Sequence, residues 1–341
     1  MIGGEFDIDV QRIQSQGHNN ILSEKVSTFA TGRSALYQII KAAMVEKSIS
    51  QVMVPDYLCS SILVPLLKLG FEPVFYPINN VLEMEKNPFS ELYKEGSIVV
   101  LINYFGLMDM TRQVQQVREL DPKAIIVEDD VQAYYEFEKA NTDVDYRFTS
   151  LRKWFALPDG GLVKSKNTHL HSVDTSNIFH QYKVAGSILK TLRNPNHYND
   201  SVYLELFEKG EGLIDEDIDK GMSAITRDHI SYTDVERISY IRNRNANYII
   251  EGLKNMNIEP ILPLLEGNTP LFVPIWLEDR NKVRKAMFKH NVFCPVHWPL
   301  EGMPVKKGAE MAEHELSIIV DQRYTHDDMN LILSLIDDNI R

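Results

Sequence analysis

Lys153 stands in a sequence context that could make its amine reactive. It follows an expected strand over residues 146–150 and precedes two aromatic residues, Trp154 and Phe155. Residues 158–161, Pro-Asp-Gly-Gly, then form a turn into a second apolar strand. Burial beside aromatic side chains disfavours the ammonium form, and a neutral amine can attack a carbonyl carbon. Most lysines are solvated surface charges, so Lys153 becomes a candidate only with support from the rest of the chain.

Polar and aromatic side chains also stand at the ends of three expected strands, over residues 51–54, 97–103 and 124–127. These runs are short and apolar, as is typical of strands covered on both faces of a parallel sheet. The residues at their ends are Asp56 and Tyr57, Asn103 and Tyr104, and Glu128, Asp129 and Asp130. Ligands of open parallel sheets bind beyond the carboxyl ends of the strands. We therefore expect these ends to converge with Lys153 on one crevice.

The same crevice should receive the start of a helix expected over residues 31–44. Apolar residues recur there at helical spacing, and Gly32 and Ser34 stand in the first turn. The N–H groups at a helix start lack intrahelical partners and lie at the positive end of the dipole, so they can hold a phosphate. The simpler alternative is that Ser34 is an ordinary helix N-cap.

The composition excludes several classes of function. The chain has 341 residues, of which 44% are apolar and 25% charged, and its net charge of -12 argues against a nucleic-acid partner. Its longest apolar run, residues 62–71, is too short to span a membrane. Cys59 and Cys294 give neither a disulfide framework nor metal-ligand spacing. With no secretory signal visible, we expect a reduced, cytoplasmic protein without a metal.

Expected strands and helices alternate at least three times in the first half of the chain, which indicates an α/β fold with a largely parallel sheet. We expect an N-terminal arm, a large domain and a small C-terminal domain, over residues 1–27, 28–235 and 236–341.

Within the small domain the sequence predicts two strands and a final helix, over residues 271–276, 292–295 and 325–340. Residues 167–221 have the composition of a loop-rich stretch. The chain contains no GxGxxG or GxxxxGK[ST] motif, which disfavours a nucleotide cofactor.

Five motifs in a fixed order give the chain a family resemblance. They are TGRSAL (31–36), VPDYLCSS (54–61), LINYFG (101–106), VEDDVQA (127–133) and SLRKWFALPDGG (150–161). With them the chain resembles the pyridoxal-phosphate-dependent aminotransferases of fold type I, and among these the DegT/DnrJ/EryC1/StrS group of nucleotide-sugar aminotransferases. The resemblance implies a large domain with a mostly parallel seven-stranded sheet between helices, followed by a small C-terminal α+β domain.

The resemblance implies two catalytic residues. Lys153 matches the lysine to which pyridoxal phosphate is covalently bound, and Asp129 matches the acid that pairs with the pyridine nitrogen. A buried carboxylate at that place keeps the ring protonated, which the cofactor needs in order to act as an electron sink. Asp130 is the neighbouring alternative, because an alignment error of one residue would exchange the two.

The resemblance also implies a set of cofactor contacts, at Gly32, Arg33, Ser34, Tyr57, Gln132 and Ser150. Tyr57 would stack on the pyridine ring, Gln132 would lie near the phenolic oxygen, and the other four would bind the phosphate. His297 resembles a histidine at the substrate end of the small domain. Each of three residues has an alternative role: Tyr57 could be a core residue, Gln132 a helix-start cap, and His297 a structural or solvent-facing histidine.

Basic and amide side chains gather in residues 183–197. Lys183, Lys190, Arg193 and His197 bring local positive charge to an acidic chain. Such charge suits a diphosphate, so we predict that this segment, with Arg193 in particular, binds the nucleotide part of a substrate. The alternative is a solvated helix face followed by a loop.

The reaction implied by the resemblance moves an amino group from an amino acid, with glutamate as the expected donor, to a keto group of a nucleotide-linked sugar. The family builds its site at a two-fold interface, so we expect a homodimer. Some sugar-processing relatives carry histidine in place of the lysine, whereas this chain keeps Lys153, which favours transamination. A sugar dehydratase or lyase of the same fold, and a non-catalytic regulatory protein that binds the cofactor, remain alternatives.

One stretch departs from the family. Many members carry an Asn-x-Arg element that reaches the phosphate site of the neighbouring subunit, but residues 219–223 read Asp-Lys-Gly-Met-Ser. Arg152, directly before the lysine, could supply the missing positive charge.

Overall fold

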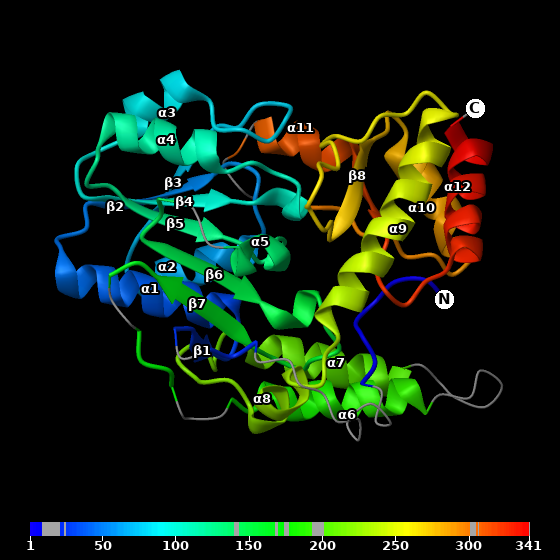
Figure 1. The fold of residues 1–341 in the computed structure, drawn as a ribbon, viewed down its shortest axis with the longest axis horizontal. Coiled ribbons are helices and arrows are strands. Elements are labelled where there is room, and N and C mark those ends of the chain that lie inside the picture. The colour runs from blue at the N-terminus through cyan, green and yellow to red at the C-terminus, as the bar shows by residue number, and fades with distance from the viewer. Residues whose placement is uncertain are drawn as a thin grey trace.

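The structure is a computed structural model that describes residues 1–8, 21–23, 25–139, 143–167, 170–173, 177–192, 201–300, 305 and 307–340. The described part contains a seven-stranded and a two-stranded sheet, with helices around both (Figure 1). Within these ranges every helix is too short or too polar to cross a bilayer.

The seven-stranded sheet is mostly parallel, as the sequence predicts. Its order is β1-β7-β6-β5-β4-β2-β3. Strands β3, β2, β4, β5 and β6 run parallel to one another, while β7 is antiparallel to both β6 and β1. The bounds are β1 Ser27–Phe29, β2 Gln51–Pro55, β3 Pro73–Tyr76, β4 Ser97–Ile102, β5 Ile125–Asp129, β6 Tyr146–Ser150 and β7 Gly161–Ser165.

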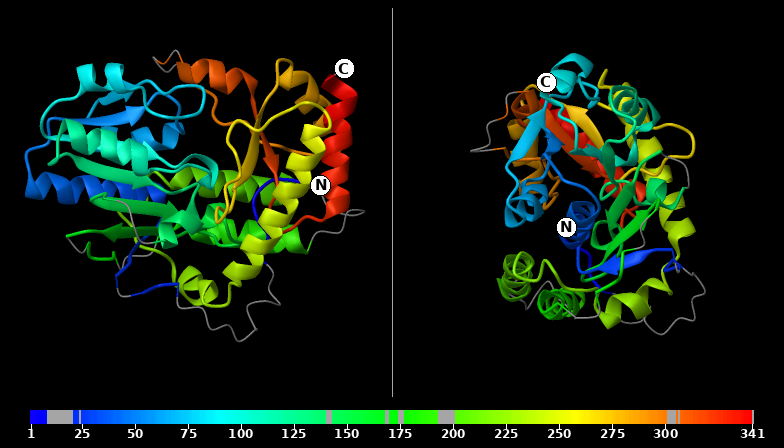
Figure 2. Two further views of the ribbon diagram at one scale, coloured as in Figure 1. Left: turned by 45° about the horizontal axis from the view of Figure 1, so that its top comes forward. Right: turned by 90° about the vertical axis from the view of Figure 1, so that its left-hand side faces the viewer.

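Helices cover this sheet on both sides, which explains why its central strands are buried along their whole length. Every residue of β2, β4, β5 and β6 is buried. Figure 2 shows the two layers of helices when the molecule is viewed end-on. The helices in the first part of the chain are α1 Gly32–Glu46, α2 Leu63–Lys68, α3 Lys86–Leu92, α4 Thr111–Leu120 and α5 Tyr134–Glu138. Helix α1 packs against β6 and β7, so its start lies beside the end of β6.

The two-stranded sheet has a core of its own. It pairs β8 (Phe272–Trp276) with β9 (Glu315–Ile319) and packs against three helices, α9 (Val235–Lys254), α10 (Arg280–Lys289) and α12 (His326–Ile340). The preceding helix α11 spans Lys307–His314. The prediction of a strand over residues 292–295 is wrong, because Val292 forms only an isolated bridge, with Ile2. Pro295 has no N–H for a ladder, and β9 takes the place beside β8.

The prediction of a loop-rich stretch over residues 167–221 is also wrong. Two helices of 13 residues lie there, α6 (Phe179–Thr191) and α7 (Ser201–Leu213), and they pack on each other. The buried face of α6 carries Lys183, Ser187 and Lys190, while Ile178, next to its start, is exposed. Apolar periodicity therefore fails here because polar residues point inward. A shorter helix, α8 (Ala224–Ile230), follows.

Candidate active site

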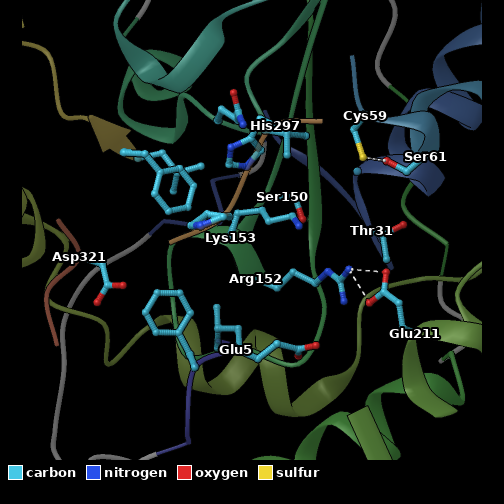
Figure 3. Close-up of a pocket in the computed structure, with 18 of the residues that line it drawn as sticks. Glu5, Thr31, Cys59, Ser61, Ser150, Arg152, Lys153, Glu211, His297 and Asp321 are labelled. Carbon is cyan, nitrogen blue, oxygen red and sulfur yellow. Dashed lines mark hydrogen bonds and ion pairs between the residues drawn. The ribbon is translucent and has the colours of Figure 1, made fainter. Parts of the chain in front are cut away.

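A cavity of about 560 Å³ opens at the carboxyl ends of the parallel strands. Its wall combines the start of α1, the ends of β5 and β6, residues 293–298 between α10 and α11, and residues 3–6 of the N-terminus. It brings together seven of the residues predicted from the sequence, namely Gly32, Arg33, Asp129, Gln132, Ser150, Lys153 and His297. Ser34 and Tyr57 do not line it, and Arg193 lies outside the described residues. Figure 3 shows Lys153 in the middle of this cavity with His297 beside it.

Lys153 ends a short 3-10 turn, η4 (Leu151–Lys153), that follows β6 directly. Its side chain is exposed to the cavity, whereas Trp154 and Phe155 point the other way and are buried in the protein core. The aromatic pair thus anchors the turn, with the Trp154 indole N–H donating to the carbonyl of Val131 at 3.0 Å.

The environment of Lys153 favours its neutral form. Burial of the amine within the protein lowers its pKa, and the Arg152 guanidinium lowers it further, against opposing contributions that include Glu211 and Glu5. A lysine with a lowered pKa is the form of amine that can add to a carbonyl group.

Asp129, and not Asp130, faces the cavity. Asp129 Oδ1 accepts the N–H of Val131 at 2.9 Å, and its other carboxylate oxygen has no hydrogen-bond partner among the described residues. Burial raises the pKa of Asp129 to about 7, although the Val131 bond opposes this. Asp130 points to the opposite side of the strand, where its carboxylate accepts from the Arg147 guanidinium at 2.8 Å. The alternation of side chains along an extended strand therefore separates the two acids.

The start of α1 forms a cradle beside Ser150. Thr31 is the N-cap and accepts the N–H of Ser34 at 3.1 Å, so the alternative that Ser34 caps the helix is wrong. A side chain at position 32 would put its Cβ only 3.0 Å from Val131 and 3.6 Å from Ser150. Glycine thus lets the helix start approach the sheet without crowding the Val131 side chain. The N–H groups of this first turn, together with Thr31 and Ser150, are suited to an anion such as a phosphate.

Three basic residues near this cradle share one acid, Glu211 of α7. Its carboxylate lies 3.0 Å from Arg33, 3.0 Å from Arg152 and 3.1 Å from Lys183. Burial acts to raise the pKa of Glu211, but the Arg152, Lys183 and Arg33 charges outweigh it and hold the pKa well below its usual range. Arg33 is further bound to Asp215 at 2.6 Å. Sequence patterns did not indicate Glu211, because its helix lies in a stretch without apolar periodicity.

Of the two predicted cofactor contacts Gln132 and Tyr57, only Gln132 lies at the cavity wall. Gln132 lines the cavity, and its side-chain oxygen accepts the N–H of Phe105 at 3.0 Å. Tyr57 is fully buried behind the wall, with its ring 5.1 Å from that of Trp298, and its hydroxyl donates to the carbonyl of His297. The aromatic ring that lines the cavity at this place is Trp298, which no sequence motif indicated.

The basic segment over residues 183–197 is only partly described. Lys183 lines the cavity and pairs with Glu5 at 2.7 Å, and Lys190 pairs with Asp7 at 2.9 Å. Arg193 and His197 lie outside the described residues. The two lysines therefore hold the acidic N-terminal residues against the cavity in this structure.

No protein-family model matches the chain, and no curated protein matches it. Solved structures do. Spr1654 from Streptococcus pneumoniae, described as a sugar aminotransferase, matches in its PLP form with a TM-score of 0.71 at 13% identity, over 99% of this chain and 98% of that chain.

Two further structures agree with it. The sugar aminotransferase CalS13 from Micromonospora echinospora has a TM-score of 0.67 at 14% identity, over 99% of this chain and 100% of its own. A DegT DnrJ EryC1 StrS aminotransferase from Brucella abortus has a TM-score of 0.63 at 14% identity, over 92% and 86%. The chain is therefore built on the fold of the fold-type-I, PLP-dependent aminotransferases.

Proposed function

We propose that this chain is a PLP-dependent aminotransferase that moves an amino group from an amino acid, with glutamate as donor, to a keto group of a nucleotide-linked sugar. One observation carries the proposal: Lys153, with its lowered pKa, and the buried Asp129 face the same cavity at the carboxyl ends of the strands. A primary amine and a rigidly held carboxyl group are the two side chains that this cofactor chemistry requires.

The residues present fit the cofactor. Pyridoxal phosphate, when bound, supplies the carbonyl group and the electron sink through which an amino group is moved. Lys153 would hold the cofactor and then serve as the base that moves protons. The Asp129 carboxylate oxygen that Val131 leaves unused would accept the ring N–H. The start of α1, with Thr31 and Ser150, would bind the phosphate, and Arg152 would add positive charge.

The sugar and its nucleotide belong to the proposal for three reasons. The solved structures similar in fold are named as sugar aminotransferases. The cavity of about 560 Å³ lies within the range of pockets that hold a cofactor-sized ligand. Lys183 at the cavity wall, with Lys190 near it, offers positive charge to a diphosphate that replaces the carboxylates now paired with these two lysines.

A half-reaction tests the cofactor chemistry without any knowledge of the sugar. The purified chain is mixed with pyridoxal phosphate, and its absorption is followed as L-glutamate is added. We expect the band of the bound cofactor to disappear while one equivalent of 2-oxoglutarate forms, measured by mass. A regulatory protein would keep the band and release no 2-oxoglutarate. The absence of any bound cofactor would contradict the proposal.

The acceptor is tested by a screen of keto-sugar nucleotides with glutamate, read by mass. A product that has exchanged oxygen for an amino group supports transamination, whereas loss of water alone would indicate a dehydratase.

Once an acceptor is found, Arg193→Ala should raise its KM and leave the glutamate half-reaction almost unchanged, because only the acceptor carries a diphosphate. Equal losses in both half-reactions, or no change in either, would remove residues 183–197 from the nucleotide site.

A further inference from the structure

Glu315 is a buried acid that the proposed reaction does not use. It stands at the start of β9 and is fully inaccessible to solvent. Its carboxylate makes no ion pair with an arginine or lysine within the described ranges, because Arg280 donates to the Glu315 backbone carbonyl instead. Burial raises the pKa of Glu315 to about 8, with Ser317, the His297 N–H and the Arg280 and Arg284 charges opposing it. Burial of an ionisable carboxyl group costs free energy, and the hydrogen bonds of Glu315 indicate its role.

The two oxygens of Glu315 are engaged by two different kinds of donor. The backbone N–H of His297 donates to Oε2 at 2.7 Å, and the Ser317 hydroxyl lies 2.5 Å from Oε1. The same hydroxyl lies 2.7 Å from Nδ1 of the His297 ring. The result is a continuous path of hydrogen bonds from Glu315 through Ser317 to the imidazole, and His297 lines the cavity beside Lys153.

The protonation state of Glu315 determines which group donates each hydrogen bond along this path. The pKa of His297 is lowered to about 3, by burial and then by the Lys153 charge, so the ring is neutral and carries one N–H. The backbone N–H can only donate, which leaves Oε1 as the place for a proton on Glu315. When Glu315 is ionised, the Ser317 hydroxyl donates to Oε1 and accepts from Nδ1–H, and Nε2 is a bare acceptor. When Glu315 is protonated, its O–H donates to Ser317, the hydroxyl donates to Nδ1, and Nε2 carries the hydrogen.

We propose that Glu315 and Ser317 are positioning residues that set the tautomer of His297, so that one proton on Glu315 decides whether Nε2 offers a donor or an acceptor to a ligand beside Lys153. With Glu315 protonated, Nε2–H donates to a carbonyl or hydroxyl oxygen of the ligand. With Glu315 ionised, Nε2 accepts from a hydroxyl or amine of the ligand. The identity of that ligand as a keto sugar rests on the proposed function. The hydrogen-bonded path from Glu315 through Ser317 to His297, called the relay below, does not rest on it.

The surroundings of the ring make the tautomer matter. The imidazole lies between Phe105 and Phe272, with ring centroids 5.6 and 5.1 Å away. Hydrogen bonds are stronger and mismatched donors more costly in such apolar surroundings than in water. The tautomer with Nε2–H therefore favours a ligand that places an acceptor oxygen at Nε2 over a ligand that places a hydroxyl hydrogen there.

The other ionisable groups near the relay are named by their elements. Tyr57 and Cys294 have pKa values raised by burial, that of Cys294 to about 12. Arg280 and Arg284 come from α10, and their charges act to lower the pKa of Glu315. Lys153 of η4 has a lowered pKa, and a change in its charge would also alter the field at the ring, so the test below includes its removal.

The tautomer can be read directly, without substrate or cofactor. Histidine labelled with ¹⁵N gives a pyrrole-type shift for the protonated ring nitrogen and a pyridine-type shift for the bare one, and His297→Asn identifies the signals. At a pH about two units below the Glu315 pKa of about 8, we expect the tautomer with the hydrogen on Nε2. At a pH about two units above this pKa, we expect the tautomer with the hydrogen on Nδ1. The exchange should persist in Lys153→Ala. The same tautomer at both pH values would overturn the proposal.

Glu315→Gln gives the sharpest test. The backbone N–H of His297 still needs an acceptor, so the amide oxygen must face it and the NH₂ group must face Ser317. The serine hydroxyl then donates to Nδ1, and the variant should hold Nε2–H at every pH. A variant that still exchanges with pH would show that another group carries the proton.

Two further variants keep the test valid if that one does not fold. Ser317→Ala cuts the path and should uncouple the tautomer from pH, whereas Ser317→Thr keeps the hydroxyl and should restore it. Tyr57→Phe is the matched control, because Tyr57 donates to the carbonyl of His297 and not to its ring. It should exchange as the wild type does. If no transamination is found, these tautomer results still decide the relay by themselves.

Discussion

At the scale of single residues, the candidate chemistry depends on which of two adjacent acids faces the cavity. Asp129 lines it with the carboxylate oxygen that Val131 leaves unused, and Asp130 is bound to Arg147 on the other side of the strand. We predict that Asp129→Asn lowers turnover by at least about 100-fold while some cofactor stays bound, because an amide cannot stabilise the ring N–H as a carboxylate does. Single-turnover kinetics with glutamate measure the effect.

Asp130→Asn is the matched control for this change. It should reduce the free energy of unfolding, since it weakens a buried ion pair, but should leave the glutamate half-reaction largely intact. A large loss of turnover at Asp130 with little effect at Asp129 would show that the wrong acid had been chosen.

Lys153 gives the second prediction. Borohydride treatment of the chain loaded with pyridoxal phosphate should attach the cofactor to this residue, because its amine is exposed to the cavity and its pKa is lowered. Peptide mapping by mass identifies the labelled lysine. Lys183 also lines the cavity but is held by Glu5 and Glu211, so a label there would contradict the assignment.

The raised pKa of Asp129 also has a consequence for stability. The unfolded chain ionises this carboxyl group near pH 3.8 and the folded protein near pH 7, so the folded state binds more protons between these values. The free energy of unfolding should therefore fall as pH rises through this window. Cofactor-free Asp129→Asn lacks this contribution. As pH rises through this window, its free energy of unfolding should therefore increase by up to about 4 kcal/mol relative to that of the wild type. Denaturant titrations over a pH series measure this difference, and parallel curves would contradict it.

Some residues of the site could be predicted from the sequence and others could not. Lys153, Asp129 and Gly32 sit in short local motifs, so their places at strand and helix ends follow from neighbouring residues. Glu211 and Glu5 reach the cavity from segments far away in the chain, through ion pairs that no local pattern encodes. Tyr57 illustrates a further limit, since a motif places a residue near the site but does not say whether its ring or that of Trp298 lines the cavity.

At the scale of elements, the site depends on how closely β7 passes the start of α1. An added Cβ at Gly161, the first residue of β7, would lie 2.1 Å from the carbonyl oxygen of Thr31. We predict that Gly161→Ala separates the strand from the helix start and reduces the free energy of unfolding by at least about 2 kcal/mol. It should also weaken binding of the cofactor, because Thr31 and the following N–H groups move. Thermal unfolding and a cofactor titration measure the two effects.

Gly212→Ala is the control for this substitution. Gly212 lies in the last turn of α7, and an alanine methyl there would meet no atom of the described chain within 4 Å beyond the backbone of its own helix. Alanine should therefore be neutral or stabilise by up to about 1 kcal/mol. Equal behaviour of the two variants would mean that the close approach of β7 to α1 is not required.

The elements differ in how well the sequence predicts them. Strand β6 has its expected bounds, and β8 and α12 begin within one residue of theirs and end where expected. Helix α6 was missed because its inner face is built from lysines and a serine that bind the N-terminal residues. Strand β9 was missed because two polar residues of the relay, Glu315 and Ser317, interrupt its apolar pattern.

At the scale of the whole molecule, we predict a homodimer. The family resemblance implies a site at a two-fold interface, and exposed apolar side chains on or beside the α6–α7 pair offer surface for it; these are Ile178, Leu192, Val202 and Leu204. Light scattering at micromolar concentration should give twice the mass of 39.2 kDa. An active monomer would contradict this prediction.

The overall fold is more predictable than the surface. Identity to the similar solved structures is 13–14%, yet the chains agree over nearly their whole length. The alternation of buried strands and amphipathic helices is sufficient for such a fold, since many different apolar residues can fill the same core. Which acceptor the cavity takes depends on a few polar side chains, and these are not constrained by the pattern that specifies the core.

The placement of the tryptophans gives the protein an optical signal of its own. Of the three in the chain, Trp298 lines the cavity and Trp154 directly follows Lys153, while Trp276 lies in β8 of the other sheet. A cofactor that absorbs where indole emits would take energy from Trp298 at the cavity wall and from Trp154 beside Lys153. Ultraviolet-excited emission should therefore dim in proportion to occupancy, and Trp298→Phe should remove a large part of that response. Loading could then be followed in real time in unlabelled protein.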